Sequence, residues 1–289
     1  MKILSTPGWE QYSLLDTGEG MRLEQFGKYR IVRPDPQAIW QTHLNQNEWL
    51  QADAVYNAGT KSWDNKNNVP LKWLMHYKDL SFWAELTPFK HTGVFPEQIL
   101  QWDWIMEKLR VQNKEQKTVK VLNLFGYTGI ASLAAASTGA VVTHVDASKP
   151  TIAWARENQK VSGLESKPIR WILEDAIKFV QREAKRGNKY DAIIMDPPVY
   201  GHGPEGERWE FTESFPQLLT ALKKVLSDKP VFVLINAYAI SSSSLMLENV
   251  LKDFVPTKKS NIEVGELALE EKDSNRLLST GIFGRWSSV

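Results

Sequence analysis

The segment Val119–Gly129, with the sequence VKVLNLFGYTG, is a short apolar run that breaks into a glycine-bracketed turn. A stretch of small residues, IASLAAAS, follows directly and predicts a helix. Strand, glycine turn and helix in this order are typical of the first half of a nucleotide-binding βαβ unit. Gly126 and Gly129 allow the backbone to turn tightly and to approach a ligand. Their G-x-x-G spacing favours a ligand without phosphates over a dinucleotide, although an ordinary strand-to-helix connection has the same pattern.

Three further apolar runs follow, each with an acidic residue at or just beyond its end. They are Val141–Val145 before Asp146, Ile169–Leu173 before Glu174-Asp175, and Ala192–Met195 before Asp196. The carboxyl ends of parallel strands form the ligand crevice of an open α/β sheet. We therefore expect Asp146 to accept hydrogen bonds from ribose hydroxyls and Asp175 to reach an adenine amino group. Capping of the following helix is the alternative for both residues.

This ordered set, from about Lys90 to the C-terminus, resembles the class I S-adenosylmethionine-dependent methyltransferases. Within them it is similar to the group around ribosomal RNA large-subunit methyltransferase I, which shares a TG-x-F-x-x-Q segment, here Thr92–Gln98. The resemblance implies an α/β fold with a Rossmann-like seven-stranded sheet and S-adenosylmethionine as the cofactor. It also implies that Phe95 and Gln98 contact that cofactor.

The predicted cofactor-binding residues combine the strand tips, the glycine turn and this segment. They are Phe95, Gln98, Asn123, Phe125, Gly126, Tyr127, Thr128, Gly129, Asp146, Ala147, Ser148, Asp175, Ala176 and Asp196. For Asn123 and Tyr127 a hydrogen bond to the local backbone is the alternative.

The turn Asp196-Pro197-Pro198 follows the fourth apolar run and predicts the catalytic site. Two prolines fix the backbone and remove two donors, which leaves the Asp196 carboxylate and the Pro197 carbonyl as acceptors. Such acceptors orient an attacking amine or ring nitrogen, and Tyr200 can stack on a flat substrate such as a flipped base. We therefore predict Asp196, Pro197 and Tyr200 as catalytic residues. The alternative is a rigid turn with Tyr200 packed in its own loop.

The chain has 289 residues, a net charge of +1 and no cysteine. Methylation at C5 of a pyrimidine normally needs a thiolate, so this reaction is excluded. The resemblance favours RNA, possibly ribosomal in origin, as the acceptor, with a base nitrogen or a ribose oxygen as the methylated atom. The near-neutral charge does not indicate nucleic-acid binding, so a protein or small-molecule acceptor, or a cofactor-binding module without catalysis, are alternatives.

Residues 1–89 differ from the rest because tryptophans lie among short apolar runs broken by Gly, Pro, Asn and Asp. This pattern predicts a small β-rich domain with a possible role in substrate recognition, followed by a methyltransferase domain at residues 90–289. Strands are expected at Met21–Phe26 and Tyr29–Val32. The tryptophans are either stacking platforms for bases or the aromatic core of a small domain.

The remaining sheet strands are expected at Val231–Ile235, Asn261–Leu269 and Thr280–Trp286, and a glycine-rich mobile loop at Gly201–Gly206. No apolar run approaches the ~20 residues that cross a membrane, and the first residues lack a signal-peptide core. The sequence thus predicts a cytoplasmic protein. The five histidines are dispersed, so no metal-ligand cluster is expected.

Overall fold

The computed structural model describes residues 1–6, 8–113, 118–238, 240–255 and 261–288. The chain forms two compact units. Unit 1 consists of Met1–Ile3, Gln101–Leu267 and Gly281–Val289, and unit 2 of Leu4–Leu100 and Ala268–Thr280.

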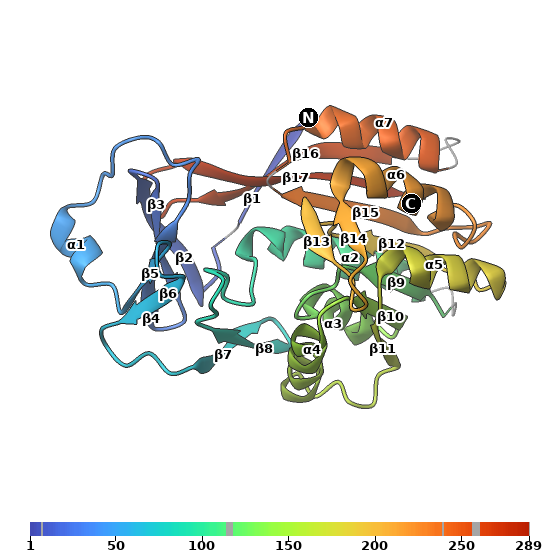
Figure 1. Cartoon of the computed structure of the whole chain (residues 1–289), viewed down its shortest axis with the longest axis horizontal. Helices are drawn as coiled ribbons and strands as arrows, with labels where there is room; N and C mark the ends of the chain where they lie inside the picture. The colour runs from blue at the N-terminus through green and yellow to red at the C-terminus, as the bar shows by residue number, and fades with distance from the viewer. Residues whose placement is uncertain (7, 114–117, 239, 256–260, 289) are drawn as a thin grey trace. The chain divides into compact units, whose positions relative to one another are not determined.

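Unit 1 is built on a large mixed sheet (Figure 1). Its strands are β1 (Lys2–Ser5), β9 (Lys120–Leu124), β10 (Val141–Asp146), β11 (Ile169–Leu173), β12 (Ala192–Met195), β15 (Phe232–Tyr238), β16 (Asn261–Glu270) and β17 (Leu277–Ser287). Their order across the sheet is β1-β16-β17-β15-β12-β9-β10-β11. Strands β9, β10, β11, β12 and β15 are parallel, and β17 is antiparallel to β15.

Helices cover both faces of this sheet, because successive strand residues point alternately to two hydrophobic cores. The helices are α2 (Ile99–Asn113), α3 (Ile130–Ser137), α4 (Lys149–Val161), α5 (Ala176–Lys185), α6 (Phe211–Leu222) and α7 (Ser244–Phe254). Leu122 and Ile193 pack against α5, α6 and α7, whereas Val121 and Ala192 pack against α2 and α3. With both faces buried, the edge at the carboxyl ends of the strands is left to bind a ligand.

The predicted α/β fold is confirmed, and three differences add to it. The seven expected strands are present, but β1 joins β16 as an eighth strand. The segment Gly201–Gly206 was expected to be an irregular loop, and this is wrong in part: β13 (Tyr200–His202) and β14 (Arg208–Glu210) form an antiparallel hairpin. The helix expected from Pro96 begins as a 3₁₀ turn, η1 (Pro96–Gln98), before α2.

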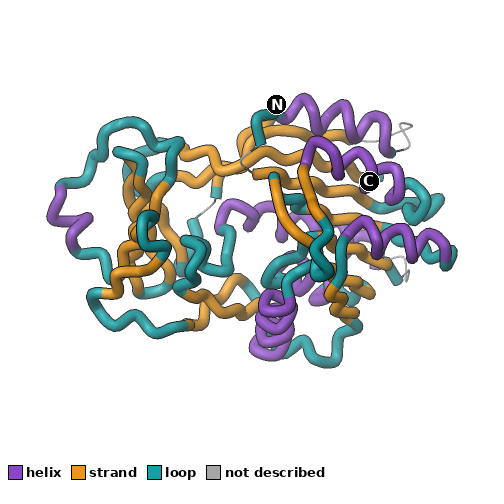
Figure 2. Tube along the Cα trace, in the orientation of Figure 1, coloured by secondary structure: helices purple, strands orange, loops and turns teal. Residues whose placement is uncertain are grey.

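Unit 2 consists mainly of strands and loops, as Figure 2 shows by colour, and the expected β-rich character is confirmed. Its elements are β2 (Tyr12–Gly18), β3 (Met21–Phe26), β4 (Tyr29–Pro34), α1 (Gln46–Leu50), β5 (Ala54–Asn57), β6 (Ser62–Asn65), β7 (Lys72–Tyr77) and β8 (Leu80–Glu85). Strands β2 to β6 form one sheet in chain order, and β7 pairs with β8.

The tryptophans of this unit favour the aromatic-core interpretation. Those at positions 9, 40, 49, 63, 73 and 83 are all buried or half-buried. The indole N–H groups of Trp9 and Trp63 donate to the backbone carbonyls of His76 and Thr87, at 2.8 and 2.7 Å. Rings held in this way serve packing within unit 2.

The division into units differs from the predicted domains 1–89 and 90–289. Unit 2 extends to Leu100 and also includes Ala268–Thr280, which contains the ends of β16 and β17. A substrate-recognition role for residues 1–89 remains a prediction. Within the described ranges, none of the helices is both long and apolar enough to span a membrane.

Candidate active site

The predicted site residues of unit 1 meet at one edge of the sheet. Leu124 at the end of β9 is in register with Val145 of β10 and Met195 of β12. Asp146 at the end of β10 is in register with Leu173, the last residue of β11. The glycine turn, Asp146, Asp175 and Asp196 therefore follow neighbouring strands at their carboxyl ends.

The turn after β9 has an unusual backbone. Phe125 and Tyr127 have φ angles of 56° and 51°, and Gly129 has 83°. Left-handed backbone at non-glycine residues costs of order 1–3 kcal/mol each and often marks a functional site. The glycines are needed for a reason that the sequence did not reveal: a Cβ at Gly126 would lie 2.3 Å from the His144 ring, and a Cβ at Gly129 would lie 2.9 Å from the Cβ of Ala155. The turn is thus shaped by packing against its own strand and helix.

Asp146 connects this turn to helix α4. Its Oδ2 accepts the N–H of Tyr127 at 2.9 Å, and its Oδ1 accepts the Ser148 N–H and the Thr151 hydroxyl, both at 2.9 Å. Burial raises the pKa of Asp146, and these three hydrogen bonds act in the opposite direction. A carboxylate offers about four acceptor positions, so three donors from the described residues leave one position, on Oδ2, for a ribose hydroxyl.

Asp175 is the N-cap of α5. Its side chain accepts the backbone N–H of Lys178 at 2.9 Å, as the capping alternative predicted. The side chain is half-buried, and its second oxygen leaves room for the predicted adenine contact, so the two roles are compatible. The neighbouring Glu174 is held by Arg182, whose Nη1 lies 2.7 Å from its Oε1.

Asn123 lies in the interior of unit 1, where its amide donates to the Ser132 hydroxyl at 2.8 Å. That hydroxyl is 3.0 Å from Nδ1 of His144, a fully buried residue on β10. Burial lowers the pKa of His144 to about 3, which keeps the imidazole neutral. This chain of polar groups supports the glycine turn from below, and the predicted cofactor contact of Asn123 remains a prediction.

The other predicted cofactor residues occupy different positions. Thr128 is buried and its carbonyl accepts the Asn158 amide at 2.9 Å. Ser148 is the N-cap of α4 after the half-buried Ala147, and Ala176 is the buried first residue of α5. Phe95 and Gln98 flank η1 in unit 2, and their cofactor contact remains a prediction.

The turn after β12 presents the predicted catalytic residues differently. Asp196 is half-buried and Pro197 is buried, whereas Tyr200 is 53% exposed. The Tyr200 ring is T-shaped to His202 with centroids 5.2 Å apart, and the guanidinium carbon of Arg208 lies 5.9 Å from its centre. Tyr200 is therefore an exposed ring flanked by a cation, and it is not packed in its loop.

Trp209 on β14 is a site residue that the sequence analysis missed. Its indole N–H donates to the carbonyl of Pro198 at 2.7 Å, and its ring lies 4.7 Å from that of Phe125. It is only 4% exposed. The sole sequence signal is the buried position between exposed Arg208 and half-buried Glu210, a period-2 pattern that the glycine-rich segment before it conceals.

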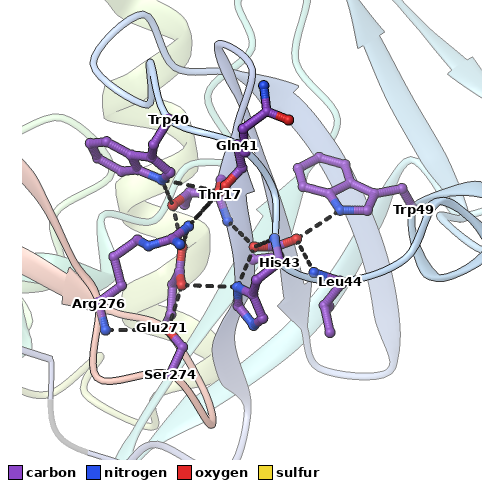
Figure 3. Close-up of polar contacts among 10 residues, drawn as sticks. Thr17, Trp40, Gln41, His43, Leu44, Trp49, Glu271, Ser274 and Arg276 are labelled. Atoms are coloured by element: carbon purple, nitrogen blue, oxygen red, sulfur yellow. Dashed lines mark hydrogen bonds and ion pairs between the residues drawn. The ribbon is translucent and has the colours of Figure 1, made fainter.

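Unit 2 contains a second polar cluster, and here the expectation that no metal-ligand cluster exists is wrong. Asp16, His43 and Glu271 come from distant segments and each offers a ligand atom, all within 4.8 Å of one another (Figure 3). The His43 Nδ1 lies 2.7 Å from Asp16 Oδ1 and 3.4 Å from Glu271 Oε2.

Hydrogen-bond donors already fill this cluster. The Asp16 oxygens accept the backbone N–H groups of Thr17, His43 and Leu44 and the indole N–H of Trp49. Glu271 contacts the hydroxyls of Thr17 and Ser274, and the guanidinium of Arg276 lies 3.5 Å away. Since the oxygens have donors and a fixed cation is close by, the geometry favours a hydrogen-bonded clasp over a metal site.

Comparisons with known proteins agree with this geometry. A strand-order reversal beside β9, a glycine turn and carboxylates at the strand tips define the class of α/β methyltransferases that bind S-adenosylmethionine. Residues 43–259 match the family described as S-adenosylmethionine-dependent methyltransferase. The chain belongs to this family, and S-adenosylmethionine is its cofactor.

The similar proteins include ribosomal RNA large subunit methyltransferase K/L from Shewanella baltica, 30% identical over 186 residues, which are 64% of this chain and 25% of that protein. The corresponding protein of Shewanella frigidimarina is 32% identical over 148 residues, 50% of this chain and 20% of its own. The chain thus spans at most about a quarter of these relatives.

Among solved structures, a SAM-dependent methyltransferase from Agrobacterium tumefaciens is 40% identical with a TM-score of 0.94, covering 100% of this chain and 94% of the other. A protein assigned as a methyltransferase and complexed with SAH shares the fold at 15% identity and a TM-score of 0.74, covering 96% of this chain and 76% of the other.

Proposed function

We propose that this methyltransferase transfers its methyl group to RNA, at a base nitrogen or a ribose oxygen. The ribosomal RNA methyltransferases among its relatives support the acceptor class. The observation that carries the proposal is the exposed Tyr200 ring, which follows the acceptors Asp196 and Pro197 by a few residues and has Arg208 beside it. An exposed aromatic ring with a neighbouring cation suits a stacked base and its phosphate.

The proposed cofactor site uses the strand tips. Asp146 accepts from a ribose hydroxyl through Oδ2, Asp175 accepts from the adenine amino group, and the turn from Phe125 to Gly129 lies beside the methionine part. Phe95 and Gln98 complete the site by family resemblance. Bound S-adenosylmethionine supplies a strongly electrophilic methyl carbon. Asp196 and the Pro197 carbonyl then hold the N–H or O–H of the acceptor, which places its lone pair in line with that carbon.

The absence of cysteine limits the acceptor atom. A carbon nucleophile at C5 of a pyrimidine would need a thiolate, and the chain has none. A nitrogen or oxygen already has a lone pair, so positioning is most of the work.

The experiment that tests the acceptor is transfer of labelled methyl from S-adenosylmethionine into a lysate of cells lacking the enzyme, separated into RNA, protein and small molecules. Label in RNA is the expected result. Label only in protein or small molecules would discard RNA and keep the methyltransferase.

Two variants test the site itself. Asp146→Ala should weaken S-adenosylmethionine binding about tenfold or more, because a hydrogen bond to a charged group is worth about 1.5–3 kcal/mol. Asp196→Ala should leave cofactor binding nearly intact and remove methyl transfer. Thr151→Val is the matched control, since it removes one partner of Asp146 and keeps the carboxylate. Unchanged affinity in Asp146→Ala, measured by calorimetry, would reject the ribose assignment.

A protein or small-molecule acceptor is the second candidate, and charge favours it. The net charge is +1, and unit 2 has more Asp and Glu than Lys and Arg. If residues 1–89 recognise RNA, they do so through aromatic and hydrogen-bonding contacts more than through charge. The proposal includes a cytoplasmic location, which fractionation of cells would test.

A further inference from the structure

We propose that Trp209 is a positioning residue that couples the cofactor turn to the acceptor loop. This inference rests on the proposed role of the Asp196–Tyr200 loop in holding the acceptor. Trp209 contacts neither partner directly in this assignment, and it acts through the two segments that do.

The first contact is with the acceptor loop. The Trp209 indole N–H donates to the Pro198 carbonyl at 2.7 Å, directly between the predicted catalytic residues Pro197 and Tyr200. Pro198 is a residue whose own nitrogen cannot donate, so its carbonyl is the backbone group through which this position is held. The β-ladder adds the pairing of Trp209 with Gly201, and the N–H of Phe211 donates to the carbonyl of Val199 at 2.9 Å.

The second contact is with the cofactor turn. The Trp209 and Phe125 rings are edge to face, with centroids 4.7 Å apart and planes at 61°. Edge-to-face pairs of this kind contribute about 0.5–1.5 kcal/mol beyond their buried area. Phe125 has φ of 56°, so its backbone needs support from its surroundings, and the buried indole provides it.

One rigid ring system thus bonds the loop that follows β12 and packs on the turn that follows β9. Trp209 is 4% exposed and part of the core beneath α5, α6 and α7, so the indole has little freedom to move on its own. A change in the position of Phe125 when the cofactor binds must therefore shift Pro198, or compress the contact between them.

Hydrogen exchange on the whole chain, with and without S-adenosylhomocysteine, tests this coupling without any acceptor. In the wild type the ligand should protect amides of the turn at 125–129 and also those of β13 and β14. In Trp209→Leu, which lacks both contacts, protection should remain at the turn and disappear from the hairpin. The matched control is Trp286→Phe, because Trp286 lies in the same core and its Nε1 has no hydrogen-bond partner among the described residues.

Two results would overturn the inference. One is a wild-type hairpin that the ligand does not protect, or one that stays protected in Trp209→Leu. The other is equal loss of protection in Trp286→Phe, which would mean that any core truncation has this effect.

Turnover separates the two contacts. Trp209→Phe keeps an aromatic ring for Phe125 but loses the bond to Pro198, so kcat should fall about three- to tenfold while the affinity for S-adenosylhomocysteine stays within about twofold. Trp209→Leu should weaken both. Because the exchange experiment needs no acceptor, a failure of the RNA proposal leaves its outcome unaffected, and the two failures are distinguishable.

Discussion

At the scale of single residues, Gly126 and His144 form a matched pair. A methyl group at position 126 would meet the His144 ring at 2.3 Å, and this ring is fully buried and bonded to Ser132. Gly126→Ala should therefore lower the free energy of unfolding by about 1–3 kcal/mol through overpacking. In a His144→Ala background the same substitution should cost much less. Urea denaturation of the four proteins measures this, and an equal cost in both backgrounds would contradict it.

His144 also makes stability depend on pH. Its pKa is lowered from 6.5 to about 3 in the folded chain, because burial disfavours the imidazolium. Below pH 6.5 the unfolded chain binds a proton that the folded chain does not, so stability falls as the pH drops toward 3. Between pH 7 and pH 5 this single group should remove about 2 kcal/mol.

Urea denaturation at both pH values, on the wild type and His144→Gln, isolates this share. The variant should lose about 2 kcal/mol less than the wild type. Some pH dependence should remain, since His91 in unit 2 has a pKa of about 4 for the same main reason, burial. Identical losses in the two proteins would show that His144 is not buried in solution.

At the scale of elements, the start of α5 combines a cap with a proposed ligand contact. Asp175→Ala should destabilise the helix by about 1 kcal/mol, whereas Asp175→Ser retains a capping oxygen and should leave stability nearly unchanged. Both variants should weaken S-adenosylhomocysteine binding several-fold, because neither has the carboxylate that accepts from adenine. Calorimetry and thermal unfolding separate the roles: a Ser variant that binds like the wild type would leave Asp175 as a cap alone.

The elements also show what the sequence could predict. Strand tips with Asp146 and Asp196 were found because carboxyl ends of parallel strands meet at one edge, a rule that needs no knowledge of distant contacts. The hairpin of β13 and β14 was missed because its glycines resemble an irregular loop, while its pairing depends on Trp209 reaching Phe125. The eighth strand, β1, was missed because its partner β16 lies far along the chain.

At the scale of the whole chain, unit 2 includes a segment from the far end of the sequence. Glu271 and Arg276 lie between β16 and β17, yet they contact Thr17 and the clasp around Asp16 (Figure 3). No local pattern announces such a contact, because Asp16, His43 and Glu271 are isolated polar residues when read along the sequence. The boundary of the N-terminal domain therefore cannot be set from its own residues.

The clasp gives a test of this assignment. The Glu271 side chain is fully buried and contacts the hydroxyls of Thr17 and Ser274, with His43 and Arg276 within 3.4 and 3.5 Å. Glu271→Ala leaves those donors and the Arg276 charge without their acceptor, so the free energy of unfolding should fall by about 3 kcal/mol. Glu270→Ala, its exposed neighbour, is the control and should change stability by less than about 0.5 kcal/mol. If the clasp works through hydrogen bonds, a chelator should leave the midpoint of urea denaturation unchanged in the wild type. A midpoint that falls on chelation would instead assign a metal to Asp16, His43 and Glu271.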